Sequence, residues 1–231
     1  MHLCHGSMRS AGQRCGVACL PRKQLPGPCH TCTRCSVAIA EPTISTKAIV
    51  GGDQMRLVMM RHAESEERLQ SIRDHDRPIT DEGRSSAREV AEKLAEKGWL
   101  PDLIVSSDST RTKQTLDTMA EAHPAFSQAD TLFRGSLYTV AALDGQTRKH
   151  LQEVVVAEVE KRKEQIHCVL CLGHNKGMEE AATSLAGNLV RLETANAALL
   201  RKSGESWQEA MAEEHAWELV DVIVPQSQQG H

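Results

Sequence analysis

The sequence predicts an α/β protein, a three-layer α/β/α sandwich with a mainly parallel central sheet. Apolar runs of strand length alternate with stretches whose apolar residues recur at helical spacing, as expected when helices cover both faces of such a sheet. Three of the apolar runs, 57–60, 103–107 and 168–172, also lead into an Arg or a His. Open α/β sheets bind their ligands at the carboxyl ends of the strands, so this placement predicts a polar site there.

The elements follow in order along the chain. Residues 56–60 form a predicted buried strand, and the polar stretch 64–79 a loop with at most one short helix. Thr80 is a suitable N-cap for a helix that ends at Gly98. The remaining predictions are strands at 102–106, 166–172, 195–201 and 217–224, and helices at 110–122, 139–164 and 177–186, the last one closed by Gly187.

The composition is that of a soluble globular protein. The 231 residues suit one domain with an appendage, and no apolar run approaches the roughly 20 residues of a membrane span. Residues 54–231 hold 21 basic and 29 acidic side chains, a net charge of −8. Such an acidic body argues against a nucleic-acid surface, so an anion site would have to be a local group of Arg and His.

Residues 1–53 differ from the rest and form a predicted N-terminal extension before a domain at 54–231. They hold six basic and two acidic residues, and the first acid is Glu41. This pattern favours an organelle transit peptide, for a chloroplast or mitochondrion; the alternative is a disordered or lineage-specific tail on a cytoplasmic protein.

Six of the eight cysteines precede residue 36. Cys29, Cys32 and Cys35 could hold zinc or a cluster together with His30, but the second half of a four-ligand site is missing, so we expect no metal. Cys168 and Cys171 lie three apart in a predicted strand and should therefore face opposite sides of the sheet, as core residues.

The side chains at the strand ends suit phosphoryl chemistry. An imidazole can act as a nucleophile near neutral pH, a second histidine can stay protonated and donate to a phosphoryl oxygen, and arginine binds phosphate through a planar fork. His62, His174, Arg61 and Arg111 are candidates by position. Pro78 restricts Arg77 to an extended conformation and so aims that side chain as well. These five residues could surround one phosphoryl group without a metal or another cofactor.

Five segments, in order, resemble the motifs of the histidine phosphatase superfamily, in particular its SixA-type phosphohistidine phosphatases. Arg61-His62-Ala63 is similar to R-H-G, with Ala in place of Gly, and residues 77–83 to R-P-L-T-x-x-G. The other segments are 107–115, similar to S-P-x-x-R-A-x-Q-T, 173–177, similar to G-H-N-P-G, and 194–197, similar to T-A-x-A.

The resemblance implies a phosphoglycerate mutase-like fold and a role for each matching residue. His62 would be phosphorylated on a ring nitrogen, and Arg61, Arg77, Arg111 and His174 would hold the phosphoryl oxygens. Water would then hydrolyse the phosphohistidine, with no cofactor.

No general acid is evident from the sequence. Asn175 stands where acid phosphatases of the superfamily carry Asp, and residues 131–140 lack the inserted acid of the mutase-type members. Glu64 is the nearest acid in sequence to His62 and is a possible proton donor. A site without a donor suits P–N substrates better than phosphoesters.

The sequence thus predicts a metal-independent phosphatase that acts on protein phosphohistidine. Two alternatives stay open, a general small-molecule phosphomonoesterase of the same superfamily and a catalytically weak phosphate-binding module. The partner would be a phosphorylated protein or a small phosphorylated metabolite, with no nucleic acid and no membrane involved.

Overall fold

The computed structural model describes residues 54–67, 71–140 and 146–228. The chain divides into two units, Met1–Ala48 and Ile49–His231, and the description concerns the second unit. The predicted N-terminal extension, with Cys29, Cys32 and Cys35, lies outside the described residues.

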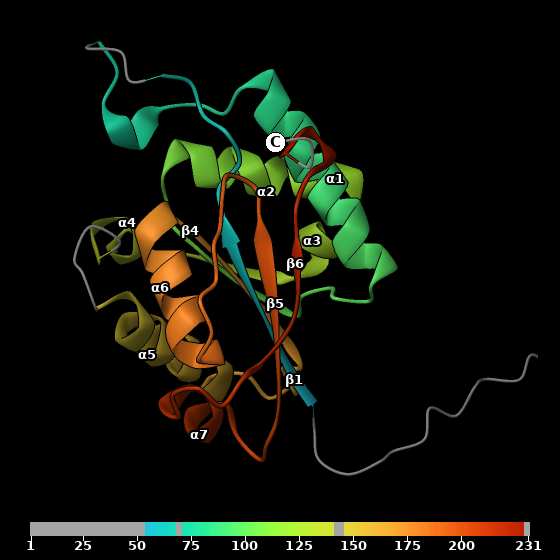
Figure 1. The fold of residues 1–231 in the computed structure, drawn as a ribbon, viewed down its shortest axis with the longest axis vertical. Coiled ribbons are helices and arrows are strands. Elements are labelled where there is room, and N and C mark those ends of the chain that lie inside the picture. The colour runs from blue at the N-terminus through green and yellow to red at the C-terminus, as the bar shows by residue number, and fades with distance from the viewer. Residues whose placement is uncertain (1–53, 68–70, 141–145, 229–231) are drawn as a thin grey trace, which may run out of the picture. The chain divides into compact units, whose positions relative to one another are not determined.

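A mixed sheet forms the centre of the described unit (Figure 1), with the strand order β3-β2-β4-β1-β5-β6. The neighbours β3, β2, β4 and β1 run parallel, whereas β5 is antiparallel to both β1 and β6. The mainly parallel sheet of the prediction is therefore confirmed. The strands are β1 Gln54–Arg61, β2 Leu103–Ser106, β3 Asp130–Phe133, β4 Cys168–Gly173, β5 Ala197–Ser203 and β6 Glu218–Ile223.

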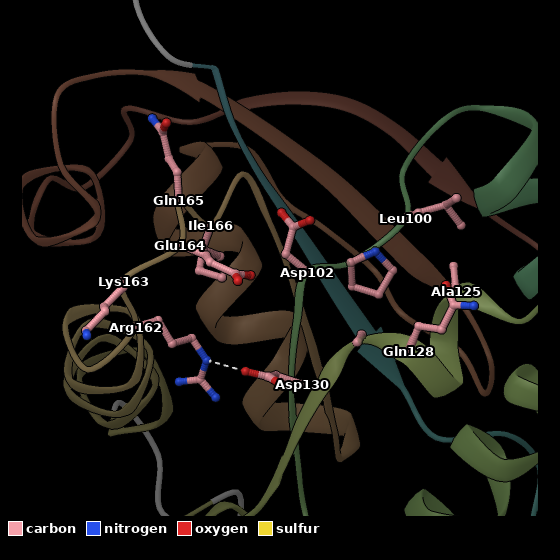
Figure 2. A pocket seen from close by; sticks show the side chains of 12 residues that line it. Leu100, Asp102, Ala125, Gln128, Asp130, Arg162, Lys163, Glu164, Gln165 and Ile166 are labelled. Atoms are coloured by element: carbon pink, nitrogen blue, oxygen red, sulfur yellow. Dashed lines mark hydrogen bonds and ion pairs between the residues drawn. The ribbon is translucent and has the colours of Figure 1, made fainter.

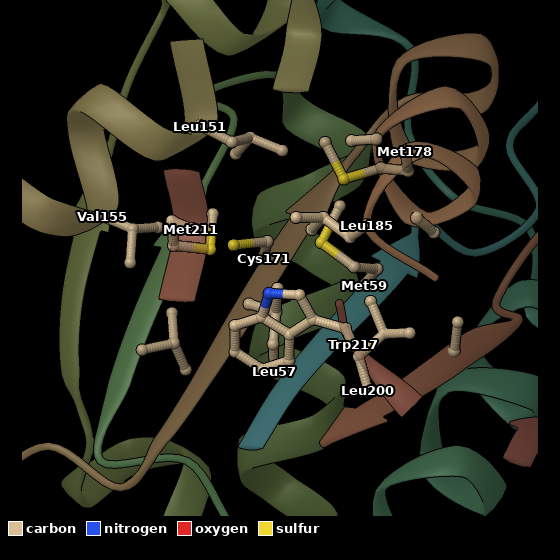
Figure 3. Close-up of a cluster of buried hydrophobic side chains, with 14 of the residues drawn as sticks. Leu57, Met59, Leu151, Val155, Cys171, Met178, Leu185, Leu200, Met211 and Trp217 are labelled. Atoms are coloured by element: carbon tan, nitrogen blue, oxygen red, sulfur yellow. The ribbon is translucent and has the colours of Figure 1, made fainter. Parts of the chain in front are cut away.

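Helices cover both faces of the sheet, which confirms the three-layer architecture. One buried cluster joins the sheet to α1, α2 and α3, and the other joins it to α4, α5, α6 and α7. Figure 3 shows the second cluster, in which Met59 and Cys171 of the sheet meet Leu185 of α6 and Val155 of α5. The helices are α1 Asp81–Glu96, α2 Thr110–Ala122, α3 Ala125–Gln128, α4 Ser136–Val140, α5 Thr147–Glu160, α6 Asn175–Ala186 and α7 Trp207–Ala212, with 3₁₀ turns at Asp74–Asp76 and Gln226–Gln228.

Two glycines have a clear structural reason. An added Cβ at Gly83 would lie 2.3 Å from the carbonyl oxygen of Glu64, so only glycine lets the first turn of α1 pack on the chain that follows β1. Gly187 has a φ of 72° and ends α6 in the left-handed conformation, as predicted. The predicted N-cap is confirmed too, because the Thr80 hydroxyl accepts a hydrogen bond from the amide of Gly83.

The predicted helix at 139–164 is wrong in its extent. The structure has α4, which ends at Val140, and a separate α5 at Thr147–Glu160, with residues 141–145 outside the described part. Only Leu151 and Val155 of the apolar positions in α5 are fully buried. Beyond Glu160 the chain has to turn toward β4, and helical spacing in the sequence did not reveal that turn.

The sequence analysis also missed β3, α3 and α7. The strand β3 lies at one edge of the sheet, and most of its side chains are exposed. Backbone pairing with β2 holds this strand in place. Because its side chains are mostly exposed, the sequence lacks the apolar alternation that reveals a strand. The helices α3 and α7 have four and six residues, too few for a helical period to show.

Cys168 and Cys171 are buried free thiols in separate core clusters on opposite faces of β4, as predicted. Burial raises the pKa of each to about 12. Both are therefore neutral packing residues.

A cavity of about 630 Å³ lies at the amino ends of β2, β3 and β4 (Figure 2). Asp102, Asp130 and Arg162 line it, and Arg162 is paired with Asp130 and with Glu158. It thus lies at the edge of the sheet opposite to the predicted site. Every helix within the described ranges is too short or too polar to cross a membrane.

Candidate active site

The ends of three neighbouring strands form the candidate site. Strands β2, β4 and β1 lie side by side in the sheet, and backbone pairing continues past their carboxyl ends. The amide of His62 donates to the carbonyl of Gly173 at 3.0 Å, and the amide of Ser107 donates to that of Leu172 at 3.0 Å. The continued pairing sets His62, His174 and the start of α2 next to one another.

The ring of His62 is oriented by its own backbone neighbour. Its Nδ1 lies 2.7 Å from the carbonyl oxygen of Ala63, and a carbonyl can only accept, so Nδ1 carries the proton. Nε2 is then the unprotonated nitrogen, and it accepts a hydrogen bond from Nε of Arg111 at 3.1 Å. The lone pair that a nucleophile needs is therefore on Nε2, facing an arginine.

His174 has the opposite tautomer. Arginine only donates, so the contact of 3.3 Å between Nη2 of Arg111 and Nδ1 of His174 leaves Nδ1 as an acceptor. Its Nε2–H then donates to the Ser107 hydroxyl at 2.9 Å. The ring centres of His62 and His174 are 5.2 Å apart. Arg111 thus bridges the two histidines.

All three of these side chains are buried, with exposed fractions of 7% for His62, 8% for His174 and 6% for Arg111. The residues that follow Arg111 fix the start of α2 against the other segments. The Thr115 hydroxyl accepts from the Ala63 amide at 3.0 Å, and the Gln114 side-chain oxygen accepts from the Ile79 amide at 2.9 Å. These two bonds give structural roles to Gln114 and Thr115, the Gln-Thr pair of the motif at residues 107–115.

Arg77 and Arg61 join the site less directly. Arg77 donates to Asp74 Oδ1, to the Ser65 hydroxyl and to the Glu66 carbonyl, so its contact with the Arg111 group runs through Asp74. Arg61 Nη1 donates to the Leu192 carbonyl at 3.2 Å. Its Nε is buried and has no hydrogen-bond partner among the described residues.

Glu64, the possible proton donor of the sequence analysis, has its side-chain hydrogen bond to Thr80 and not to either histidine. Its side chain is exposed, and its Oε2 accepts from the Thr80 hydroxyl at 3.4 Å, at the start of α1. Its backbone carbonyl accepts from the Thr80 amide. In this conformation Glu64 holds Thr80, the N-cap of α1, through two hydrogen bonds.

Sequence reasoning missed three residues of the site, Asp74, Tyr138 and Ser107. Asp74 accepts from Arg111 at 3.1 Å and from the Tyr138 hydroxyl at 2.8 Å. The Tyr138 ring also meets His174 edge-on, with 5.1 Å between ring centres. Each had a signal in the sequence: Asp74 shares a short polar loop with Arg77, Tyr138 is the single tyrosine of the chain, and Ser107 is the first residue of the third motif.

Burial and neighbouring positive charge set the protonation of the site. Burial lowers the pKa of His62 to about 3, assisted by the charges of Arg111, Arg61 and Arg77. Burial likewise lowers the pKa of His174 to about 3, assisted by His62 and Arg111. Both rings are therefore neutral at pH 7. The expectation of a second, protonated histidine would require a bound anion to offset these effects.

Burial acts to raise the pKa of Asp74, but hydrogen bonds from Tyr138 and Arg77 and the charge of Arg111 hold it well below its usual range. Asp74 is thus a carboxylate throughout the neutral range. The site therefore holds a neutral histidine pair, several arginines and one internal anion. This set can bind an oxyanion and present one unprotonated ring nitrogen to it.

We expect the free energy of unfolding to fall on acidification from pH 7 to pH 5. Each buried histidine has a folded-state pKa below the value of about 6.5 in the unfolded chain, so the unfolded state binds more protons in this range. Each should cost about 2 kcal/mol at pH 5. Urea unfolding of the wild type and of His174→Gln measures this, and the variant should lose about half of the histidine contribution.

The variant comparison also removes the effect of His75, whose pKa is raised by hydrogen bonds to Asp108 and Asp76 and which acts in the opposite direction. Equal slopes of stability against pH in the two proteins would contradict the expected role of burial.

An imidazole with one unprotonated nitrogen beside arginine donors, at the carboxyl edge of a three-layer α/β sheet, is an arrangement suited to a protein that binds phosphoryl groups. In the part of the chain that the structure describes, no group of three or more His, Cys, Asp or Glu side chains could hold a metal ion. The chain belongs to the histidine phosphatase superfamily, branch 1, whose family model matches residues 57–217. It is accordingly a phosphatase, of the hydrolase class.

Three known proteins or structures are similar to this chain. A chloroplastic protein of Arabidopsis thaliana, itself uncharacterized, is 40% identical over 221 residues, which cover 91% of this chain and 97% of that protein. SixA from Nakamurella multipartitia is 25% identical, with a TM-score of 0.58 over 75% of this chain and 97% of its own. A protein histidine phosphatase SixA in complex with tungstate has a TM-score of 0.57 at 19% identity, over 75% and 99% of the two chains, and shares the fold.

Proposed function

We propose that this phosphatase works without a metal, through a phosphohistidine on Nε2 of His62. The observation that carries the proposal is the ring orientation. Nδ1–H is held by the Ala63 carbonyl at 2.7 Å, so the unprotonated Nε2 faces Arg111 in a buried pocket. A neutral imidazole held in one tautomer is ready to attack phosphorus without first losing a proton.

The proposed reaction has two displacements. Nε2 of His62 attacks phosphorus, the new P–N bond forms, and the leaving group departs with the electron pair of its bond to phosphorus. Water then attacks the phosphohistidine, one water proton is released, and phosphate and neutral His62 result. In both steps Arg111, Arg77 and Arg61 hold the phosphoryl oxygens and offset the negative charge that develops on them, and His174 joins them once the bound anion has favoured its protonation on Nδ1.

We propose protein phosphohistidine as the substrate. An imidazole can leave phosphorus already protonated on its other nitrogen, whereas an alkoxide requires a proton from the enzyme. Glu64, the acid considered from the sequence, is exposed and contacts Thr80, which supports a site with little general acid help. The structural similarity to SixA from Nakamurella multipartitia is consistent with this class of substrate.

A small phosphorylated metabolite is the second candidate substrate, and one observation favours it. The structure brings the carboxyl group of Asp74 and the hydroxyl of Tyr138 to the site. Either group is of a type that can donate a proton to the leaving oxygen of a phosphoester. The lowered pKa of Asp74 argues against this carboxyl group as a proton donor.

We also propose that the protein acts in a plastid. The first 53 residues are basic and poor in acids, which is typical of transit peptides. The Arabidopsis relative, which is aligned over 91% of this chain, is chloroplastic.

The substrate proposal is tested with a panel at equal concentrations: a phosphohistidine peptide, p-nitrophenyl phosphate, a phosphoserine peptide and sugar phosphates. We expect kcat/KM to be highest for phosphohistidine, modest for p-nitrophenyl phosphate and about 10²–10⁴-fold lower for the alkyl phosphates, because a general acid is worth about that much. His62→Ala with each substrate is the control for contaminating phosphatases.

A sugar phosphate as the best substrate would favour the second candidate, and Glu64→Gln would then show whether Glu64 is its acid. Tight phosphate binding without turnover of any substrate would leave only the phosphate-binding module.

A further inference from the structure

Arg111 uses two different edges of its guanidinium group. The side-on edge, made of Nε and one N–H of Nη2, faces His62 Nε2 at 3.1 Å and His174 Nδ1 at 3.3 Å. The end-on edge, made of Nη1 and the other N–H of Nη2, is taken up by a single residue, because it donates to both the carbonyl oxygen and Oδ2 of Asp74. An arginine grips a phosphate through one such pair of parallel N–H groups. The pair that faces the nucleophile is the one that Asp74 leaves free.

Asp74 is itself held from two further sides. Its Oδ1 accepts from Nη1 of Arg77 at 2.9 Å, and its Oδ2 accepts from the Tyr138 hydroxyl at 2.8 Å. One carboxylate therefore joins the 3₁₀ turn Asp74–Asp76 to α2 and to α4. Its hydrogen bonds to two arginines are charge-assisted, which makes them shorter and stronger than neutral ones.

The Tyr138 ring adds a third contact to the same guanidinium. Cζ of Arg111 lies 5.7 Å from the ring centre, within the range of a cation–π interaction. The ring also packs on His174 and, edge-on at 5.0 Å, on His75. Arg111 is thus fixed by Asp74 at its end and by Tyr138 on its face, which leaves only the side-on edge to meet a ligand.

We propose that Asp74 is a positioning residue that acts through Arg111: it holds the end-on edge of the guanidinium so that the side-on pair of N–H groups is aimed at the phosphoryl group on Nε2 of His62. This inference rests on the proposed function. Asp74 does not touch the phosphoryl group and transfers no proton. An arginine side chain that no partner holds at its end has considerable rotamer freedom. A displacement of about 1 Å at a reacting group can lower the rate roughly 100-fold.

Two other roles for an acid at this position predict different results. A carboxylate that competed with phosphate for Arg111 would lower the affinity for oxyanions, and its removal would raise that affinity. A carboxylic acid that protonated the leaving group would matter for alkyl phosphates and little for p-nitrophenyl phosphate, whose leaving group needs no proton. A positioning residue matters for every substrate and for oxyanion binding, and only while Arg111 is present.

The test uses the full chain with Asp74→Ala and Asp74→Asn, alone and in the Arg111→Lys background. We expect Asp74→Ala to lower kcat/KM for p-nitrophenyl phosphate about 10–100-fold and to weaken vanadate binding, because the fork is no longer held. In the Arg111→Lys background the same substitution should change kcat/KM by less than about threefold, since the main target of Asp74 is already absent and only its pairing with Arg77 is lost. Asp76→Ala is the matched control. Asp76 lies in the same 3₁₀ turn and pairs with Arg73 and His75 instead of Arg111.

Three results would overturn the proposal: tighter vanadate binding in either Asp74 variant, equal losses with and without Arg111, or a loss confined to alkyl phosphates. Circular dichroism and urea unfolding establish that each variant is folded, and Asp74→Asn, which keeps the size of the side chain, serves if Asp74→Ala is not. Vanadate affinity is measured at equilibrium, so the coupling between Asp74 and Arg111 can be determined even if His62 forms no phosphoenzyme. A failure of the proposed function and a failure of this inference are therefore distinguishable.

Discussion

His62→Ala should abolish phosphoenzyme formation and lower kcat by several powers of ten, the largest effect that we expect of any single substitution. Alanine removes the nitrogen that is to form the P–N bond. Among the described residues, the other unprotonated ring nitrogen in contact with the side-on edge of Arg111 is Nδ1 of His174. The adduct is measured with ³²P-labelled substrate after rapid acid-free quenching. It should be labile in acid and stable in base, as a P–N bond is.

His167→Gln is the matched control, because this histidine precedes β4 at the opposite edge of the sheet and should leave turnover unchanged. A base-labile adduct would point to a carboxylate or a serine as the nucleophile. Near wild-type turnover in His62→Ala would eliminate the mechanism altogether.

The second large effect is expected at Arg111. Arg111→Lys should lower kcat/KM almost as much as Arg111→Ala, by about 10²–10³-fold, because a lysine ammonium cannot provide two parallel N–H groups or reach Asp74 and the histidines together. Steady-state kinetics with p-nitrophenyl phosphate measures the loss. Arg77→Lys should behave similarly but more mildly, because Arg77 is supplied by a loop and contacts the group through Asp74.

Arg201→Lys serves as the control for this exchange, since Arg201 forms a forked pair with Glu218 at the edge of the sheet, away from the site. Nearly full activity in Arg111→Lys would show that only net charge matters at this position, and it would also remove the basis for a positioning role of Asp74.

Much of the fold followed from local patterns. The apolar runs of β1, β2 and β4 are continuous because both faces of these strands are buried, and the apolar stripe of α1 repeats at about 3.6 residues because one face of that helix is buried. The helix α2 has the predicted bounds, 110–122. The pattern failed where burial is slight, as in the exposed edge strand β3, or where an element is too short to show a period, as in α3 and α7.

The sequence by itself determined which strands end in a histidine or an arginine, and hence that His62, His174 and Arg111 would meet, because the carboxyl ends of neighbouring parallel strands share one edge of the sheet. Only the tertiary structure decided which nitrogen of His62 is unprotonated and that Asp74 and Tyr138 support Arg111. Asp74 is 37 residues from Arg111 and 64 residues from Tyr138, and the bond from Arg111 to Nε2 of His62 spans 49 residues. A bond of this kind requires two groups within about 3 Å and in line, a condition that no periodicity along a sequence encodes.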